Sequence, residues 1–266
     1  MNVAVTSQDF GGQLRAWRQR RRLSQLDLAL DAEVSARHLS FVETGRSRPS
    51  REMVLRLASC LGLPLRERNA MLLAAGFAPA FEARSLDDPA LDLALQAVRH
   101  LIDAHAPFPA LAVDRHWNLV MQNRVVPLLL AGVAPYLLEP PVNVLRLSLH
   151  PEGLAPRILN LAEWKGHLLD RLRGQIEASG DPELERLNDE LKAYPAPASS
   201  APRKGGAASL VVPLQLAGPG GPLSFFSTTT LFGTPMEVTL SEIAIESFFP
   251  ADAQTAAALR FLAEPL

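Results

Sequence analysis

The chain has 266 residues, of which 48% are apolar, so it can bury the cores of two domains of ordinary size. No run approaches the ~18 consecutive apolar residues of a membrane span, and the N-terminus lacks the basic-then-apolar pattern of an export signal. A single cysteine, Cys60, excludes an internal disulfide framework. We therefore expect a cytoplasmic protein that does not enter a membrane.

The net charge of −2 conceals a division of the chain into a basic and an acidic part. Residues 1–80 hold 12 Arg, no Lys and 7 Asp or Glu, a net charge of +5, whereas the remainder carries −7. A basic segment attached to an acidic body favours a polyanionic partner for that segment, such as nucleic acid.

Helix-capping residues are dense in the first part of the chain, and they predict five short helices. The expected starts are Asp9, the capping box Ser24-Gln25-Leu26-Asp27, Ser35, Pro49-Ser50 and Pro64. In the second of these helices, Leu26, Ala29 and Leu30 are expected to face inward. Helices this short and close together predict one all-α domain over residues 1–80.

The rest of the chain mixes helix and strand patterns. We expect helices at 91–105, 123–130, 162–172, 182–193 and 251–262, and strands at 110–113, 118–121, 210–216, 223–230 and 236–247, with a loop at 194–206. These elements predict an α+β domain with an antiparallel sheet. The expected division is a DNA-binding domain at 1–80, a linker and connecting helix at 81–106, and a second domain at 107–266.

The helix that begins at Ser35 has an outward face suited to the major groove of DNA. Leu39 and Val42 form its core face, so Arg37 can bond guanine and Phe41 can meet a thymine methyl group. Gln25 and the arginines after the helix are placed for phosphates. The predicted DNA-binding residues are Gln25, Ser35, Ala36, Arg37, Ser40, Phe41, Arg46 and Arg48.

This segment resembles the Cro/repressor (XRE) family of helix-turn-helix regulators. The matching residues are Leu14-Arg15, Arg18, Leu23-Ser24-Gln25, Leu28-Ala29, Val34-Ser35, Leu39-Ser40, Val42-Glu43, Gly45 and Arg48-Pro49. The resemblance implies an ion pair between Arg18 and Glu43. Charge considerations agree, because a carboxylate near a helix C-terminus is unfavourable unless a cation compensates it.

The second domain resembles the MmyB-like ligand-binding domain. The matching stretches are 109–117, Asn123-Arg124, 143–146, His150-Pro151, 225–230, 233–235 and 245–252. The resemblance implies a PAS-like fold with a pocket for a small apolar ligand such as a fatty acid. One departure is Met121-Gln122-Asn123, where the family usually has a small residue, Trp and Asn, so the pocket lacks that Trp.

An apolar cavity with a few polar anchors is the expected ligand site. The candidate liners are Trp117, Met121, Trp164, Leu168, Phe225 and Phe232, although ordinary core packing is favoured for any single one of them. Arg146 and His150 are four residues apart and could clamp a carboxylate. A surface ion pair for Arg146 and a turn at His150 are equally consistent with the sequence.

Enzymatic and metal-binding patterns are missing from the sequence. The six histidines have no metal-ligand spacing, and no nucleophile elbow or phosphate-binding glycine loop occurs. We therefore expect no enzyme and no cofactor, but a homodimeric transcription regulator that binds double-stranded DNA and is controlled by an apolar ligand. The alternative is a second domain that only dimerises or binds a protein partner.

Overall fold

The computed structural model describes residues 10–197, 211–232 and 236–263. The chain divides into two compact units, with the main division between Arg84 and Ser85. The expected cap at Asp9, most of the expected loop at 194–206 and the motif at 233–235 lie outside the described residues. Within the described residues, no helix is both long enough and apolar enough to cross a bilayer.

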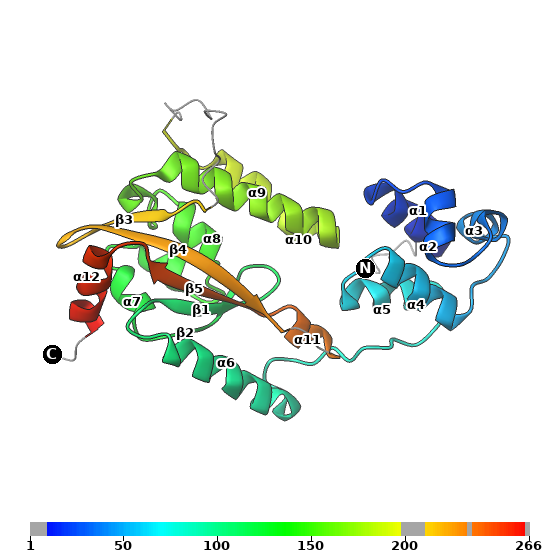
Figure 1. Cartoon of the computed structure of the whole chain (residues 1–266), viewed down its shortest axis with the longest axis horizontal. Helices are drawn as coiled ribbons and strands as arrows, with labels where there is room; N and C mark the ends of the chain where they lie inside the picture. The colour runs from blue at the N-terminus through cyan, green and yellow to red at the C-terminus, as the bar shows by residue number, and fades with distance from the viewer. Residues whose placement is uncertain (1–9, 198–210, 233–235, 264–266) are drawn as a thin grey trace, which may run out of the picture. The chain divides into compact units, whose positions relative to one another are not determined.

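The first unit contains five α-helices (Figure 1): α1 Phe10–Arg20, α2 Gln25–Asp31, α3 Ala36–Glu43, α4 Arg51–Cys60 and α5 Leu65–Ala74. Serine side chains cap three of them: Ser24 accepts from Asp27 N at 3.1 Å, Ser35 from His38 N and Ser50 from Met53 N. Gly45, at φ 72°, follows α3 in the left-handed conformation that glycine adopts without strain.

Close packing of α1 against α3 fixes the position of the third helix. A Cβ atom added to Gly11 of α1 would lie 2.5 Å from the carbonyl oxygen of Glu43, so only glycine permits this approach. Leu14, Leu39 and Leu57 are among the fully buried side chains that fill the core of the unit.

One expectation for α2 is wrong. Leu28 and Ala29 form its buried face, whereas Leu26 and Leu30 are 58% and 68% exposed. The capping box sets the start of the helix at Gln25, and in a helix of seven residues only one narrow stripe reaches the core. Leu26 and Leu30 are four apart on the opposite side of that stripe.

The second unit contains a five-stranded antiparallel sheet in the order β2-β1-β5-β4-β3 (Figure 1). The strands are β1 Ala110–Val113, β2 Leu119–Gln122, β3 Leu214–Gly218, β4 Gly221–Leu231 and β5 Ala244–Pro250. The predicted fold class is confirmed in its all-α N-terminal domain and its α+β C-terminal domain with an antiparallel sheet.

Helices and single turns cover both faces of this sheet. They are η1 Pro89–Leu91, α6 Asp92–Ala104, α7 Val126–Leu129, η2 Pro135–Leu138, α8 Val144–Leu149, η3 Ala155–Arg157, α9 Leu161–Ser179, α10 Pro182–Ala193, α11 Val238–Ser241 and α12 Ala253–Ala263. Figure 1 shows α6 on the opposite side of the sheet from α8 and α9. Two separate apolar clusters result, one on the α6 face and one on the α8–α9 face.

The strand expected at 236–247 is only partly present. Residues 238–241 form the short helix α11, and β5 begins at Ala244 and continues to Pro250. Val238 and Leu240 contribute to apolar packing from this helical turn, and the pairing with β1 and β4 starts only at Ala244. The β-branched composition of the segment therefore misled the assignment.

Candidate functional site: an exposed helix face and an apolar cavity

The outward face of α3 carries the residues expected to contact DNA. Leu39 and Val42 are buried, whereas Arg37 is exposed and Ser40 and Phe41 are half-buried. Ser35 is exposed as the cap of the helix, and Ala36 packs against the edge of the core. The start of α3 is therefore an accessible surface.

Two arginines flank the ring of Phe41. The guanidinium carbon of Arg37 lies 5.4 Å from the ring centre and that of Arg46 lies 6.0 Å from it. These cation–π distances limit where each guanidinium can point, and they explain how an aromatic ring is accommodated at a partly exposed position. Arg48, two residues after Arg46, is exposed.

Arg18 and Glu43 form the expected ion pair. Arg18 Nε lies 2.6 Å from Glu43 Oε1, Nη2 lies 3.0 Å from Oε2, and Nη1 donates to the carbonyl of Leu23 at 2.8 Å. The side-chain amide of Gln25, for which we predicted a phosphate contact, donates to Glu43 Oε2 at 2.7 Å. The network joins α1, α2 and α3, and thereby holds α3 in place.

The network also shifts the pKa values of Arg18 and Glu43. The hydrogen bond to Glu43 raises the pKa of Arg18. Burial alone would raise the pKa of Glu43, but the hydrogen bonds from Arg18 and Gln25, with the charges of Arg18 and Arg15, lower it below its usual value. Both groups therefore stay charged at neutral pH.

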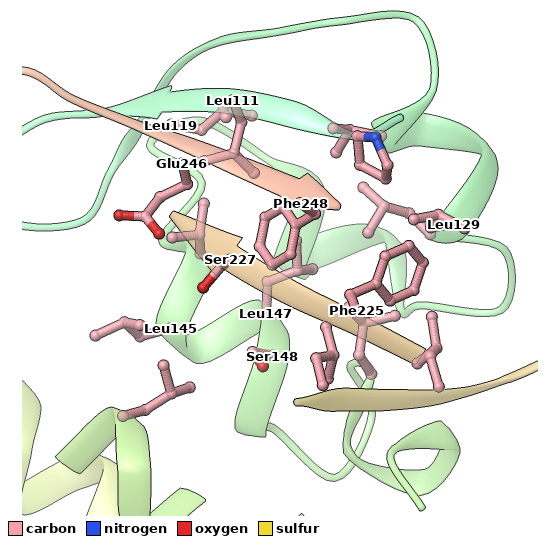
Figure 2. A pocket seen from close by; sticks show the side chains of 18 of the residues that line it. Leu111, Leu119, Leu129, Leu145, Leu147, Ser148, Phe225, Ser227, Glu246 and Phe248 are labelled. Atoms are coloured by element: carbon pink, nitrogen blue, oxygen red, sulfur yellow. The ribbon is translucent and has the colours of Figure 1, made fainter. Parts of the chain in front are cut away.

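A cavity of about 110 Å³ lies in the second unit between the sheet and the helices α7, α8 and α9. This volume is far above the ~10–15 Å³ needed to hold one water. Its lining residues are Pro109, Leu111, Trp117, Leu119, Gln122, Val126, Leu129, Leu130, Val144, Leu145, Leu147, Ser148, Leu154, Trp164, Leu168, Arg171, Leu214, Leu216, Phe225, Ser227, Glu246 and Phe248. In Figure 2, Phe225, Ser227, Glu246 and Phe248 project from β4 and β5 toward this space, with Leu147 and Ser148 of α8 opposite them.

Four of the predicted liners, Trp117, Trp164, Leu168 and Phe225, border this cavity. Trp117 has φ 67°, which a bulky residue rarely adopts. The turn is fixed by the carboxylate of Asp114, which accepts from the backbone amides of His116 and Asn118, each at 2.8 Å. This turn directs the indole of Trp117 to the wall of the cavity.

Met121 and Phe232 do not border the cavity, which corrects the prediction. The pairing of β1 with β2 shifts register between Ala112 and Val113, so Met121 pairs with Ala112 and Leu119 with Val113. This irregularity turns Met121 to the α6 face, where Phe232 also packs. Gln122 occupies the inward position instead.

Arg146 and His150 also lie away from the cavity. Arg146 bonds Glu190 in a bidentate manner at 2.7 and 2.8 Å. His150 accepts from Glu152 N at 3.1 Å, and its ring meets those of Tyr136 and Tyr194 edge-on. Val144, Leu145, Leu147 and Ser148 of α8 line the apolar cavity, whereas Arg146 borders a more polar space.

That polar space is a second cavity of about 280 Å³ between the β1–β2 turn, α8 and α10. Arg146, Glu190 and His116 contribute to its wall. The hydrogen bond from Arg146 lowers the pKa of Glu190 despite partial burial. His116 Nε2 lies 2.9 Å from Asp181, the cap of α10. Arg146 and Glu190 are therefore paired with one another, and His116 is paired with Asp181.

The polar group in the wall of the apolar cavity is an ion pair that the sequence reasoning missed. Arg171 of α9 pairs with Glu246 of β5, and its Nη1 lies 3.0 Å from Glu246 Oε2. Arg171 also donates to Thr229 Oγ1 at 2.6 Å and lies 4.6 Å from the Trp117 ring centre. The signal was present in the sequence: a lone carboxylate in an apolar strand, and an Arg spaced from Trp164 and Leu168 on one helix face.

Gln122 supplies a second polar group to the same wall. Its Oε1 atom is buried and has no hydrogen-bond partner in the part of the chain that the structure describes. Most buried polar atoms are paired, so an unpaired one at a cavity calls for an explanation.

Comparison with known proteins supports both halves of this description. Residues 94–262 match the family described as the MmyB-like transcription regulator ligand binding domain, and residues 9–71 match a helix-turn-helix domain. None of the curated proteins matches the chain. A solved structure titled "Structure of an RNA-binding Light-Oxygen-Voltage Receptor" is similar at 12% identity and a TM-score of 0.28; the alignment covers 94% of this chain and 61% of that one.

Proposed function

Because the chain belongs to the family of MmyB-like transcription regulators and carries a helix-turn-helix domain, we propose that it reads a specific DNA operator and is controlled by an apolar small molecule. The observation that carries ligand control is the apolar cavity at the centre of the second unit. The alternative, a second domain that only dimerises or binds a protein, requires no such space. The presence of a cavity in the second unit therefore favours ligand control over a domain that only dimerises or binds a protein.

Base reading is assigned to the exposed start of α3. Arg37 extends from the first turn of this helix, where recognition helices contact base edges. A guanidinium can bond the O6 and N7 atoms of guanine together. Its position beside the Phe41 ring restricts its motion before DNA arrives, and less ordering is then required on binding.

Phosphate contacts are assigned to Arg46 and Arg48. Gln25 and the backbone amides at the start of α2 are assigned the same role. Arg46 and Arg48 are exposed directly after α3, where they can reach the DNA backbone on the rim of the groove. Such contacts position the domain and carry no sequence information. A homodimer would place two copies of α3 about 34–36 Å apart, one turn of the duplex.

The cavity is assigned to a molecule with a fatty-acid-like alkyl chain. Leucine, valine and aromatic side chains form nearly all of its wall, and such surface favours apolar guests. For the ligand to control DNA binding, it must bind one state of the regulator more tightly than the other.

The DNA assignment is tested with operators selected from random duplexes. Arg37→Ala should cost about 1–3 kcal/mol at one base position and little on random DNA. Arg46→Ala, the matched control, should weaken binding to all sequences and reduce the slope of log affinity against log salt by about one. Equal losses on selected and random DNA for Arg37→Ala would refute its role.

The ligand assignment is tested by mass spectrometry of small molecules released from the natively purified protein. An alkyl-chain compound should be released from the wild type and lost from Leu168→Trp, whose larger side chain fills the cavity. Readdition of that compound should change the affinity for the selected operator. Release of no compound, together with a filled cavity in an experimental structure, would favour the alternative function.

A further inference from the structure

Two polar residues in the wall of the apolar cavity, Gln122 and Glu246, lie on a single row across the sheet, whereas Ser227 lies on the neighbouring row and Ser148 and Arg171 belong to α8 and α9. Leu111 pairs with Gln122 on one side and with Glu246 on the other, and Glu246 pairs with Thr229. Directly paired residues share one face of an antiparallel sheet. Gln122, Glu246 and Thr229 therefore face the helices from one line, and the neighbouring inward rows hold mainly apolar side chains such as Phe225 and Phe248.

The only charged residues in the wall of this cavity, among the residues described, are Arg171 and Glu246. They neutralise one another. Arg171 Nη1 bonds Glu246 Oε2 at 3.0 Å, and Nη2 bonds both Glu246 Oε1 and Thr229 Oγ1. A ligand carboxylate would meet a guanidinium that already has its counterion, and it would lie beside the carboxylate of Glu246.

The indole donors of the wall are also engaged. Trp117 Nε1 donates to Gln175 Oε1 at 2.6 Å, and Trp164 Nε1 donates to Ser148 Oγ at 3.0 Å. Neither N–H is therefore directed at a guest without breaking a bond inside the protein. The cationic and indole donors of the wall are therefore all paired within the protein, and the hydroxyl groups of Ser148 and Ser227 can either donate or accept.

In contrast to these paired donors, the wall contains a hydrogen-bond acceptor that has no partner. Gln122 Oε1 is buried at the cavity and has no donor among the described residues. A buried acceptor without a partner is unfavourable, and a guest that supplies an O–H or N–H removes that penalty. Gln122 of β2 and Glu246 of β5 pair with Leu111 of β1 from its two sides and so lie on one row. A single head group near this row can donate a hydrogen bond to Gln122.

We propose that the cavity selects an alkyl-chain ligand with an uncharged head group that donates a hydrogen bond, such as an alcohol or a primary amide, over a free carboxylate. The inference rests on the proposed ligand control and specifies the ligand class. Gln122 is the specificity-determining residue, and the Arg171–Glu246 pair excludes the anion through like charge at Glu246.

The test compares three probes on the full-length protein stripped of bound lipid. They are 1-dodecanol, dodecanoate at pH 8 and dodecyl methyl ether, which share a chain and differ in charge and donor capacity. Isothermal titration should give 1-dodecanol the lowest Kd, by about tenfold or more. Binding of dodecanoate as tight as or tighter than that of 1-dodecanol would overturn the inference.

Two variants test whether Gln122 determines the preference for 1-dodecanol. Gln122→Leu should reduce the affinity for 1-dodecanol to that for dodecyl methyl ether and leave the ether unaffected. Gln215→Leu is the matched control, because Gln215 lies on β3 between the cavity-lining Leu214 and Leu216 and so points away. An unchanged preference in Gln122→Leu contradicts the role of Gln122.

Glu246→Gln should reverse the order of the probes, since Arg171 would then lack a counterion and attract dodecanoate. If Glu246→Gln does not fold, the result with Gln122→Leu decides the question alone. If none of the three probes binds the wild type, the proposed ligand control fails as well. Tighter binding of dodecanoate to the wild type would instead contradict only the choice of head group.

Discussion

Each unit of this protein contains a buried arginine–glutamate pair, and the two pairs have different surroundings. Arg18 and Glu43 lie inside a filled helical core, with side chains 10% and 2% exposed. Arg171 and Glu246 lie in the wall of a cavity, with side chains 23% and 5% exposed. The first pair holds a helix in place, whereas the second borders the apolar cavity.

This contrast separates a structural use of buried charge from a functional one. In the first unit the pair is completed by two further hydrogen bonds, to the carbonyl of Leu23 and from the amide of Gln25. In the second unit the row that contains Glu246 also contains the unpaired oxygen of Gln122. Buried polar groups without partners mark a site, and buried polar groups with complete partners mark a scaffold.

The largest expected effect comes from breaking the pair in the filled core. Glu43→Ala leaves Arg18 buried without its counterion and should cost about 3–5 kcal/mol in the free energy of unfolding of the first unit. Glu246→Ala should cost less, since Arg171 is closer to solvent. Hydrogen exchange of the amides of each unit in the full-length protein measures the two values separately. Equal losses would break the distinction between the two pairs.

The next prediction compares a filled core with a hollow one. Leu57 is fully buried in the first unit, and Leu57→Phe should destabilise that unit by about 1–3 kcal/mol through overpacking. Leu147 borders the cavity, so Leu147→Phe can extend into empty space and should leave the stability of the second unit nearly unchanged. The same hydrogen-exchange measurement applies. A large loss of stability in Leu147→Phe would show that the core of the second unit has no space for a larger side chain.

The two units also differ in how far the sequence predicted them. The first unit depends on local signals, such as serine caps at Ser24 and Ser35 and Gly45 after α3, and these signals predicted its helices. The Arg18–Glu43 pair was implied by the resemblance to the Cro/repressor family and agreed with the charge at the end of α3. Leu26 and Leu30 were misplaced because a short helix buries only one stripe. Motifs that act over a few residues suffice for a fold made of short helices.

The second unit required information that no local pattern contains. The positions of Trp117, Trp164 and Phe225 were expected, but Met121 was placed on the wrong face because the shift in register between β1 and β2 is not visible in either strand alone. Arg171 and Glu246 are 75 residues apart and meet only through the sheet topology. A ligand site assembled from several strands therefore needs the fold before its polar groups can be assigned.

Acid should act on the first unit through Glu43. Its pKa is lower in the folded protein than in the unfolded chain, so its ion pair contributes stability above the unfolded pKa of about 4.3. This contribution is lost as the pH falls through the lower folded value. Hydrogen exchange of the first unit between pH 6 and pH 3 should show the decline. Glu43→Gln should flatten that part of the profile, and an unchanged slope would contradict the assignment.

The smallest expected effect concerns Arg146, which we considered with His150 as a clamp for a ligand carboxylate and which pairs with Glu190 instead. Arg146 and Glu190 are 42% and 36% exposed, so Arg146→Ala should cost only about 0.2–1 kcal/mol of stability. Affinity for 1-dodecanol should not change, because Arg146 borders the polar cavity and not the apolar one. Titration of Arg146→Ala beside Gln122→Leu makes the comparison direct. If Arg146→Ala weakened binding as much as Gln122→Leu, the ligand would extend into the polar cavity, and the row across the sheet would be only part of the site.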